Sequence, residues 1–146
     1  MSLEANKAIV HRMFEAFNER NLALLDELIA PNYVDYTNNI RGREGLKQIM
    51  TMDSKAFPDW HEAVEDIIAE GDKVWILLKY TVTHTGTWMG LAPTSNKITT
   101  MNVDICRIVN GKLAERWNVT DNVGLFQPLG VIEYTEQGMQ LFQQTN

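Results

Sequence analysis

The sequence predicts an α+β domain in which three N-terminal helices pack on one face of a mainly antiparallel sheet. Apolar residues recur at helical spacing through the first third of the chain. After Pro58 the period changes, and β-branched and aromatic residues dominate. Helices followed by a run of strands are typical of an α+β fold. At 146 residues the chain fits one domain with a buried core.

Three helices are expected before Pro58. Residues 3–19 form an amphipathic helix whose apolar stripe is Ile9, Val10, Met13, Phe14 and Phe17. Asn21 can cap a short second helix that ends before Pro31. Residues 31–39 are an irregular or short-strand connection, and residues 42–45 lead into a third helix that ends near residues 57–58.

Four strands are expected after Pro58. They cover residues 60–69, residues 73–85 and the two arms of a last hairpin, residues 99–121, with a loop at 86–96. A turn of helix is expected within residues 124–129. We therefore expect one domain at 1–130, followed by a polar C-terminal tail at 131–146.

The turn of the last hairpin admits two registers. A two-residue turn at 110–111 pairs Val109 with Lys112 and mixes polar and apolar side chains on both faces of the hairpin. A three-residue loop pairs Ile108 with Lys112 instead and separates the two kinds of side chain. A slip of one residue moves every side chain to the other face, so this separation favours the three-residue loop.

In that register one face of the hairpin is polar and contains an acid, an amide and an arginine. Asp104 lies directly opposite Arg116 and diagonal to Asn118. The polar face either contacts solvent or lines a wet cavity. Its members are Thr100, Asn102, Asp104, Cys106, Ala114, Arg116, Asn118 and Thr120, and the opposite face carries Met101, Val103, Ile105, Leu113, Trp117 and Val119.

Composition argues against several classes of partner. A net charge of −6 without a basic stripe disfavours nucleic acid. No apolar run approaches the ~20 residues of a membrane span, and no signal pattern is visible at the N-terminus. Cys106 is the only cysteine, which indicates neither a disulfide nor a thiolate metal cluster and favours a cytoplasmic location. The histidines share no ligand spacing and no glycine-rich phosphate loop occurs, so we expect neither a metal site nor a phosphate-binding loop.

Several segments, in order, resemble the SnoaL-like polyketide cyclase family. They are residues 6–17, 21–23, 30–35 and 42–46, then the loop motif at 84–94 and the last hairpin at 104–117. The resemblance covers residues 6–130. It implies the cone-shaped, nuclear transport factor 2-like fold, in which a strongly curved sheet and three helices enclose a cavity. It also implies a homodimer through the outer sheet face and places the polar face of the last hairpin inside the cavity.

The resemblance further implies a reaction. Polyketide cyclases of this family close a ring by intramolecular aldol condensation, using a carboxylate to remove a proton next to a carbonyl, without metal or cofactor. An apolar pocket raises the pKa of such a base toward neutrality. In an ungapped match the family's catalytic aspartate, after Trp117, falls on Asn118. An amide cannot take a proton from carbon, so the chain departs from the family pattern here.

Three candidates for catalysis follow. Asp104 is the best remaining base, although it can equally form an ion pair with Arg116 that satisfies both groups. Arg116 can stabilise a developing oxyanion, and Asn118 can donate its amide N–H to a substrate carbonyl. Both can equally belong to a structural hydrogen-bond network.

Five further residues are candidate substrate contacts: His84, Tyr36, Asn102, Trp88 and Asp121. His84 can polarise a substrate oxygen but is more often structural as a lone histidine. Trp88 is either core or part of a lid. Asp121 is expected to be a cap or turn residue rather than a ligand contact.

The sequence thus favours an enzyme acting on a small hydrophobic, polyketide-like carbonyl compound, of cyclase or isomerase type. Two alternatives remain open. One is a non-catalytic small-molecule-binding module that has lost the catalytic aspartate, as Asn118 suggests. The other is an epoxide hydrolase-like enzyme with an Asp-Arg-Asp arrangement, of which Asp104 and Arg116 supply two members and no second inward acid is evident.

Overall fold

The computed structural model describes residues 1–142 of the chain. The helices are α1 (Leu3–Glu19), α2 (Leu22–Leu28), α3 (Gly42–Ala56), α4 (Asn122–Phe126) and α5 (Glu136–Phe142). The strands are β1 (Ile29–Asp35), β2 (Ile40–Arg41), β3 (His61–Glu70), β4 (Lys73–Thr83), β5 (Lys97–Val109) and β6 (Lys112–Thr120). The last four residues of the expected tail lie outside the described residues.

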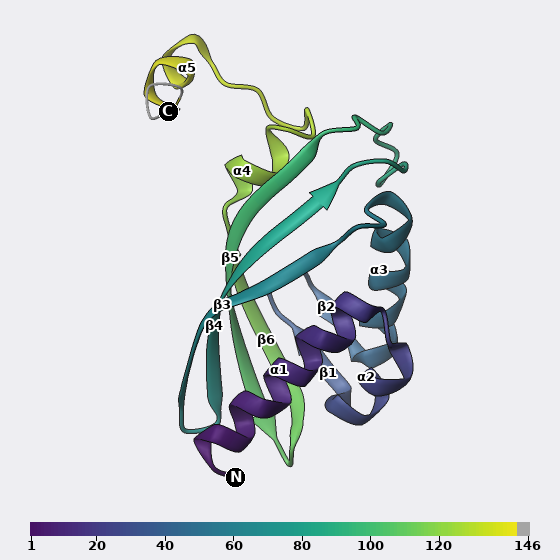
Figure 1. Ribbon diagram of the computed structural model, residues 1–146, viewed down its shortest axis with the longest axis vertical. Helices are drawn as coiled ribbons and strands as arrows, with labels where there is room; N and C mark the ends of the chain where they lie inside the picture. Colours follow the sequence, from purple (N-terminus) through teal and green to yellow (C-terminus); the bar gives the residue numbers. More distant parts are fainter. Residues whose placement is uncertain (143–146) are drawn as a thin grey trace.

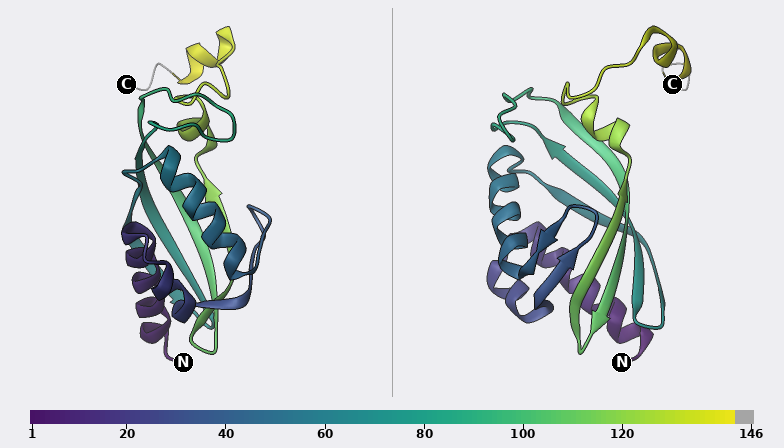
Figure 2. Two further views of the ribbon diagram at one scale, coloured as in Figure 1. Left: turned by 90° about the vertical axis from the view of Figure 1, so that its right-hand side faces the viewer. Right: turned by 180° about the vertical axis from the view of Figure 1, so that it is seen from behind.

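The strands form one strongly curved sheet in the order β2-β1-β6-β5-β4-β3 (Figure 1). All neighbours are antiparallel except β1 and β6, which run parallel. Helices α1, α2 and α3 cover the concave face (Figure 2). The α+β class and the three N-terminal helices are therefore confirmed. The connection at 31–39 contributes to β1, so the sheet has six strands where four long ones were expected.

The helices bury the apolar stripe that the sequence predicts. The Ser2 hydroxyl caps α1 by accepting from the Ala5 N–H at 3.1 Å, and Arg20 ends the helix in the left-handed conformation. Val10 and Met13 are completely buried against the sheet. This core fills the end of the molecule near the N-terminus, which is called the narrow end below. The cavity described below lies toward the other end, between α3 and the sheet.

The turn of the last hairpin is the two-residue one, so the expected three-residue loop is wrong. Val109 pairs with Lys112, and both Asn110 and Gly111 have positive φ, at 50° and 74°. These are the angles of a type I′ turn, whose twist matches that of the flanking strands. The register then shifts by one residue between Arg107 and Ile108 on β5.

This shift restores the predicted separation of faces beyond it. Asp104 lies opposite Asn118, and Arg116 is its diagonal neighbour, the reverse of the predicted pairing. Leu113 precedes the shift and is fully buried, so its expected place on the outer face is also wrong. A bulge adds one residue to a strand, so the side chains beyond it point to the opposite face from the one that simple alternation predicts. The alternation pattern of the sequence does not reveal where a bulge lies.

The polar face of the hairpin points toward the helices. Thr100, Asn102 and Asp104 on β5 are buried, whereas Met101 and Val119 on the opposite face are exposed. After β6, α4 begins two residues earlier than the turn of helix expected at 124–129. Helix α5 stands away from the body of the molecule (Figure 1). Within residues 1–142, no helix is both long and apolar enough to cross a membrane.

Candidate active site

A cavity of about 300 Å³ lies between α3 and the concave face of the sheet. The connection from β1 to β2, the loop after β4 and the region of α4 complete its wall. Much of its lining is apolar: Phe17, Ile40, Leu46, Ile49, Met50, Phe57, Trp60, Trp88, Met89, Leu125, Phe126 and Leu129. Cavities of this size and character, with a few convergent polar groups, are where small ligands bind.

The polar lining comes from both sides of the curved sheet. Asn102, Arg116 and Asn118 line the cavity from β5 and β6, as the sequence predicts. Glu62 lines it from β3, an edge strand of the sheet. Because the sheet is strongly curved, residues of β6 and β3 share one wall although two strands separate them.

Asp104 lies behind this wall rather than in it. Its side chain is fully buried, and Arg116 Nε lies 2.8 Å from Asp104 Oδ2, an ion pair without hydrogen-bond alignment. Asn102 Nδ2 donates to Asp104 Oδ1 at 2.9 Å. The two oxygens of the carboxylate therefore face Arg116 and Asn102, which stand between it and the cavity.

Burial dominates the ionisation of this pair. It raises the pKa of Asp104, and the neighbouring Arg116 guanidinium only partly opposes this rise. For Arg116 burial acts to lower the pKa, but Asp104, Tyr33 and Glu62 outweigh it and hold the pKa well above its usual value. Arg116 is thus a permanent positive charge at the cavity wall, with only 11% of its side chain exposed.

The amide of Asn118 is available to a ligand. Its backbone N–H donates to Thr37 Oγ1 at 2.9 Å, and its backbone carbonyl accepts from the same hydroxyl at 3.2 Å. Within residues 1–142 the side-chain amide has no hydrogen-bond partner. The backbone of Asn118 is therefore held in place while its side chain faces the cavity.

Among the five expected substrate contacts, Asn102 and Trp88 line the cavity. The Trp88 indole Nε1–H donates to Asp53 Oδ1 at 3.1 Å and its ring packs near Phe57. The loop that carries Trp88 lies against α3, because the Thr85 and Gly86 N–H groups both donate to the Ala56 carbonyl, at 3.0 and 3.1 Å.

His84 lies outside the cavity lining. It is fully buried, and its Nδ1 accepts from the Thr94 N–H at 3.2 Å. The neutral ring therefore carries its proton on Nε2, which has no partner within the described chain. The ring also packs against Phe57 at 5.3 Å. In this position His84 organises the loop at 84–96.

Tyr36 and Asp121 also lie elsewhere. Tyr36 is exposed, stacks on Trp117 at 5.0 Å and donates from its hydroxyl to Glu115 Oε1 at 2.9 Å, on the outer side of the sheet. Asp121 caps α4 by accepting from the Gly124 N–H at 3.0 Å. The cap interpretation of Asp121 is therefore the one the geometry supports.

Sequence reasoning missed three carboxyl groups of the lining: Glu62, Asp35 and Asp53. Burial raises the pKa of Glu62 to about 7, with a further rise from the nearby Asp104, against the lowering effects of Arg116 and Trp60. A signal existed, because alternation along residues 60–64 places Glu62 between Trp60 and Val64 on one face of the strand. An acid between two apolar neighbours is a candidate for burial.

The other two carboxyls have evident local roles. Asp35 accepts from the Thr37 N–H, the Asn38 N–H and the Asn38 side-chain amide at 2.9–3.0 Å, which shapes the turn between β1 and β2. Burial raises the pKa of Asp53, and the bond from Trp88 opposes this. Across residues 1–142 no group of three histidine, cysteine, aspartate or glutamate side chains is arranged to hold a metal ion.

Comparison with known proteins assigns the family. The SnoaL-like polyketide cyclase pattern matches residues 7–129 of the chain. The chain belongs to the SnoaL-like polyketide cyclase family. It is also 26% identical over 137 residues to DauD, an aklanonic acid methyl ester cyclase of Streptomyces sp. (strain C5), a match that covers 89% of this chain and 84% of that protein.

Solved structures support the same fold for this SnoaL-like chain. AclR from Streptomyces galilaeus, a proposed hydroxylase, superposes with a TM-score of 0.82 at 28% identity, covering 98% of this chain and 92% of AclR. IdmH from Streptomyces antibioticus, a proposed polyketide cyclase, gives a TM-score of 0.74 at 30% identity, with 86% and 99% covered. Both the nuclear transport factor 2-like architecture and the family resemblance are thus confirmed.

Proposed function

We propose that this SnoaL-like protein is a cofactor-independent enzyme that acts on a small hydrophobic, polyketide-like carbonyl compound by acid/base chemistry in the cavity. The observation that carries the proposal is the convergence of Arg116, Asn118 and a buried carboxyl group on one largely apolar cavity. An apolar wall binds the carbon skeleton, and fixed donors stabilise the enolate oxygen that forms when a proton leaves the neighbouring carbon.

Each predicted catalytic residue has a role in this proposal. The Arg116 guanidinium and the Asn118 amide N–H both donate to the substrate oxygen that becomes negative. Asp104, sealed behind Arg116, holds the guanidinium in place and keeps it charged. Asn102 is held by its bond to Asp104 and presents its remaining amide atoms to the ligand.

The test is direct assay of ring closure. Purified protein is incubated with aklanonic acid methyl ester, the compound in the name of its relative DauD, and with simpler polyketide-like β-keto esters. We expect a product of unchanged mass, because an aldol closure is an isomerisation. Arg116→Met should lower kcat/KM by about 10²–10³-fold, as loss of an oxyanion donor does. Lys79→Met, on the outer face, serves as the control.

The binding-module alternative predicts another pattern. The wild-type protein would bind these compounds without converting them, and Asn118→Asp would create activity by restoring the carboxylate at the family's catalytic position. Wild-type turnover that disappears in Arg116→Met would exclude it.

An epoxide hydrolase-like reaction is the second candidate activity. The observation favouring it is that three carboxyl groups, Asp104, Glu62 and Asp35, lie near enough to Arg116 to raise its pKa. Arg116 therefore has more than one acidic neighbour, which the sequence did not reveal. Turnover of an epoxide panel to products heavier by one water, lost in Asp104→Asn, would support this reaction. Products of unchanged mass would exclude it for the compounds tested.

Two further properties belong to the proposal. A homodimer through the outer sheet face is supported by the exposed apolar side chains of that face, Trp75, Leu77, Met101 and Val119 among them. A cytoplasmic location is supported by a single, buried cysteine, Cys106, which needs no oxidising compartment.

A further inference from the structure

We propose that Glu62 is the general base of this cavity, and that it supplies from β3 the carboxylate that Asn118 lacks on β6. The proposal rests on the proposed function of the cavity and adds the residue that removes the proton. Glu62 is 6% exposed, lines the cavity and lies on the edge strand β3, which β5 and β4 separate from β6, the strand that carries Arg116 and Asn118. A substrate in this cavity can contact both the carboxylate on β3 and the two donors on β6.

The other carboxyl groups near the cavity already have hydrogen-bond or ion-pair partners. Asp104 is fully buried behind Arg116 and Asn102. Asp35 accepts three N–H bonds within its own turn, and Asp53 accepts the Trp88 indole. A base must offer a lone pair to substrate. Both oxygens of Asp104 and of Asp35 are committed, and Asp53, which is only partly buried, has one oxygen committed to Trp88.

Glu62 differs from those carboxyls in its partners. Within residues 1–142 no side chain forms a hydrogen bond of good geometry with its carboxyl, and Trp60 lies near enough to lower its pKa. A carboxyl has room for about four hydrogen bonds, so most of its acceptor capacity faces the cavity. Trp60 lines the same cavity and can orient the carboxyl without covering it.

The backbone of Glu62 is held by two hydrogen bonds from another element. Asn18 near the end of α1 donates from Nδ2 to the Glu62 carbonyl and accepts from the Glu62 N–H at Oδ1, each at 2.8 Å. Because β3 is an edge strand, no further strand is available to bond these groups. One asparagine therefore fixes both, and a base held in this way is preorganised for proton transfer.

The electrostatic setting suits a base that works near neutral pH. Asp104 on β5 and Arg116 on β6 act on the carboxyl with opposite signs, and the buried Tyr80 and Cys106 are its other titratable neighbours. With the pKa at about 7, Glu62 is partly ionised at neutral pH and strong enough to accept a proton. A solvent-exposed glutamate would be fully ionised there but a weaker base.

The proposed step is balanced without any co-reactant. The Glu62 carboxylate takes the proton from the carbon next to a substrate carbonyl, and the C–H electron pair forms the enolate, whose negative oxygen faces Arg116 and Asn118. The enolate carbon then bonds to a second carbonyl carbon of the same molecule. The resulting alkoxide recovers the proton from the Glu62 carboxylic acid, so the product is an isomer of the substrate.

The first test measures proton removal itself, apart from ring closure. The probe is 2-acetonaphthone, a hydrophobic aromatic ketone, whose methyl protons exchange with D₂O when a base removes them. We expect the wild-type protein to accelerate this exchange and Glu62→Gln to slow it by about 10²-fold or more, the usual contribution of a general base. Glu70→Gln, at the exposed end of the same strand, is the matched control. Unchanged exchange in Glu62→Gln would overturn the proposal.

The second test needs no turnover and therefore separates this proposal from the proposed function. Protein with ¹³C-labelled glutamate carboxyls is titrated by NMR without ligand and then with 2-acetonaphthone. We expect one resonance that titrates near pH 7, is missing in Glu62→Gln and shifts when the ketone binds. A Glu62 resonance that titrates near 4.5, or that ignores the bound ketone, would refute the role of Glu62 even if the protein closes rings.

A double variant tests the relation between the two strands. If Glu62 replaces the family's aspartate, Glu62→Gln combined with Asn118→Asp should regain activity relative to Glu62→Gln alone, measured by the same exchange assay. If the double variant is no faster and Glu62→Gln alone retains wild-type exchange, the base lies elsewhere and the proposal fails.

Discussion

At the scale of single residues, three buried carboxyl groups near the cavity differ in what surrounds them. Asp35 accepts three N–H bonds, and Asp104 faces a guanidinium and an amide. Glu62 has the fewest partners, and its pKa is raised to about 7. Burial disfavours the charged form unless donors replace the lost water, and Glu62 has the fewest such donors of the three.

The first prediction concerns the pH dependence of stability. Since the pKa of Glu62 rises from 4.5 in the unfolded chain to about 7 in the folded one, the folded state binds more protons within that window. Glu62 therefore makes the wild type lose stability as pH rises from about 4.5 to 7, and Glu62→Gln should escape this loss. The stability of the variant relative to wild type should increase by up to about 3 kcal/mol between pH 4.5 and 8.

Urea denaturation at several pH values measures this difference. Glu70→Gln is the control, because its exposed side chain should leave the pH profile of the wild type unchanged. Parallel profiles for the wild type and Glu62→Gln would mean that Glu62 has an ordinary pKa.

The second prediction concerns the buried ion pair. Asp104→Ala should lower the free energy of unfolding by about 3–5 kcal/mol, because it leaves the Arg116 charge buried without its closest partner. Replacing both residues by leucine should cost less than this single change. Chemical denaturation of the single and double variants measures the difference.

An exposed pair provides the comparison. Glu4→Ala, which removes the surface pair with Lys7, should cost no more than about 0.5 kcal/mol. If Asp104→Ala cost as little as Glu4→Ala, the Asp104–Arg116 pair would contribute nothing to folding.

At the scale of elements, the last hairpin shows what the alternation of polar and apolar side chains can predict and what it cannot. The alternation correctly predicted that Asp104, Arg116 and Asn118 share a face, and the family resemblance correctly placed that face inward. The turn itself was predicted wrongly, because the register was chosen by assuming an unbroken ladder. The bulge near Ala114 makes the two-residue Asn110-Gly111 turn compatible with the separation of polar and apolar faces. The hydrophobic pattern of the sequence does not indicate this bulge.

The third prediction tests the link between α1 and β3. Asn18→Ala removes both side-chain hydrogen bonds to the Glu62 backbone and should lower the free energy of unfolding by about 1–3 kcal/mol. The amide of Glu62 should lose most of its protection against hydrogen exchange, which NMR measures residue by residue.

Asn21→Ala is the matched control for this variant. Asn21 caps α2 by accepting from the Leu24 N–H at 3.1 Å, so its loss should expose the amide of Leu24 and spare that of Glu62. Continued protection of Glu62 in Asn18→Ala would show that another group holds the edge strand.

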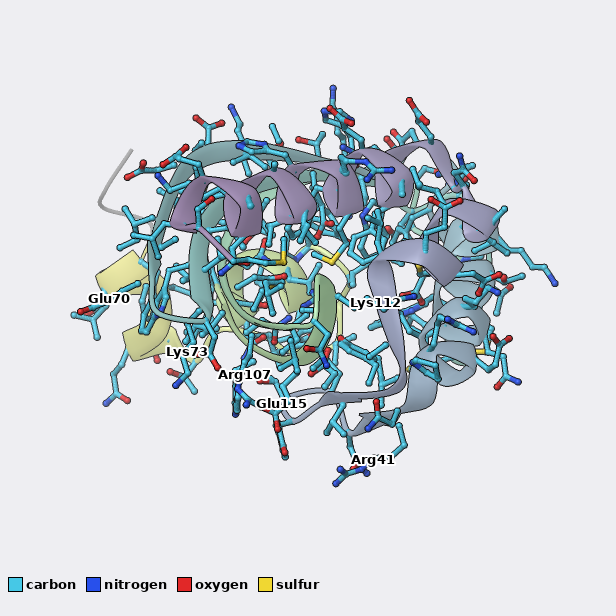
Figure 3. The ribbon with its side chains drawn as sticks, turned by 90° about the horizontal axis from the view of Figure 1, so that it is seen from below. Arg41, Glu70, Lys73, Arg107, Lys112 and Glu115 are labelled. Atoms are coloured by element: carbon cyan, nitrogen blue, oxygen red, sulfur yellow. The ribbon has the colours of Figure 1, made fainter. Side chains whose placement is uncertain are left out.

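At the scale of the whole molecule, the outer face of the sheet contrasts with the inner one. Two apolar rows cross β4, β5 and β6: Trp75, Ile105 and Trp117 in one, and Leu77, Val103 and Val119 in the other. At the narrow end, the labelled Lys73, Arg107 and Glu115 point away from α1 (Figure 3). Arg107 pairs with both Asp72 and Glu115 at 2.8 Å. The apolar rows are thus bordered by a charged edge, a pattern typical of an interface.

The fourth prediction is that this face forms the dimer. The wild type should sediment as a homodimer, and Val119→Lys should shift it to monomer, because a lysine in the apolar row would be buried without a partner charge. Val119 is 70% exposed in the single chain, so the change should leave the fold intact, as circular dichroism can verify. Met52→Lys on α3, which replaces an exposed apolar side chain away from the sheet, is the control. A wild-type protein that sediments as a monomer would contradict the prediction.

The sequence by itself determined the order and type of the main elements, the family and the three polar residues of the last hairpin. These features depend on local periodicity and on short motifs, which can be recognised in the sequence without knowledge of the fold. Only the tertiary structure decided that Asp104 lies behind the cavity wall, that Tyr36 faces outward and that Glu62 lines the same cavity as Arg116. The physical reason is the curvature of the sheet. It brings β3 and β6 together around one cavity, and burial by distant elements then sets each pKa.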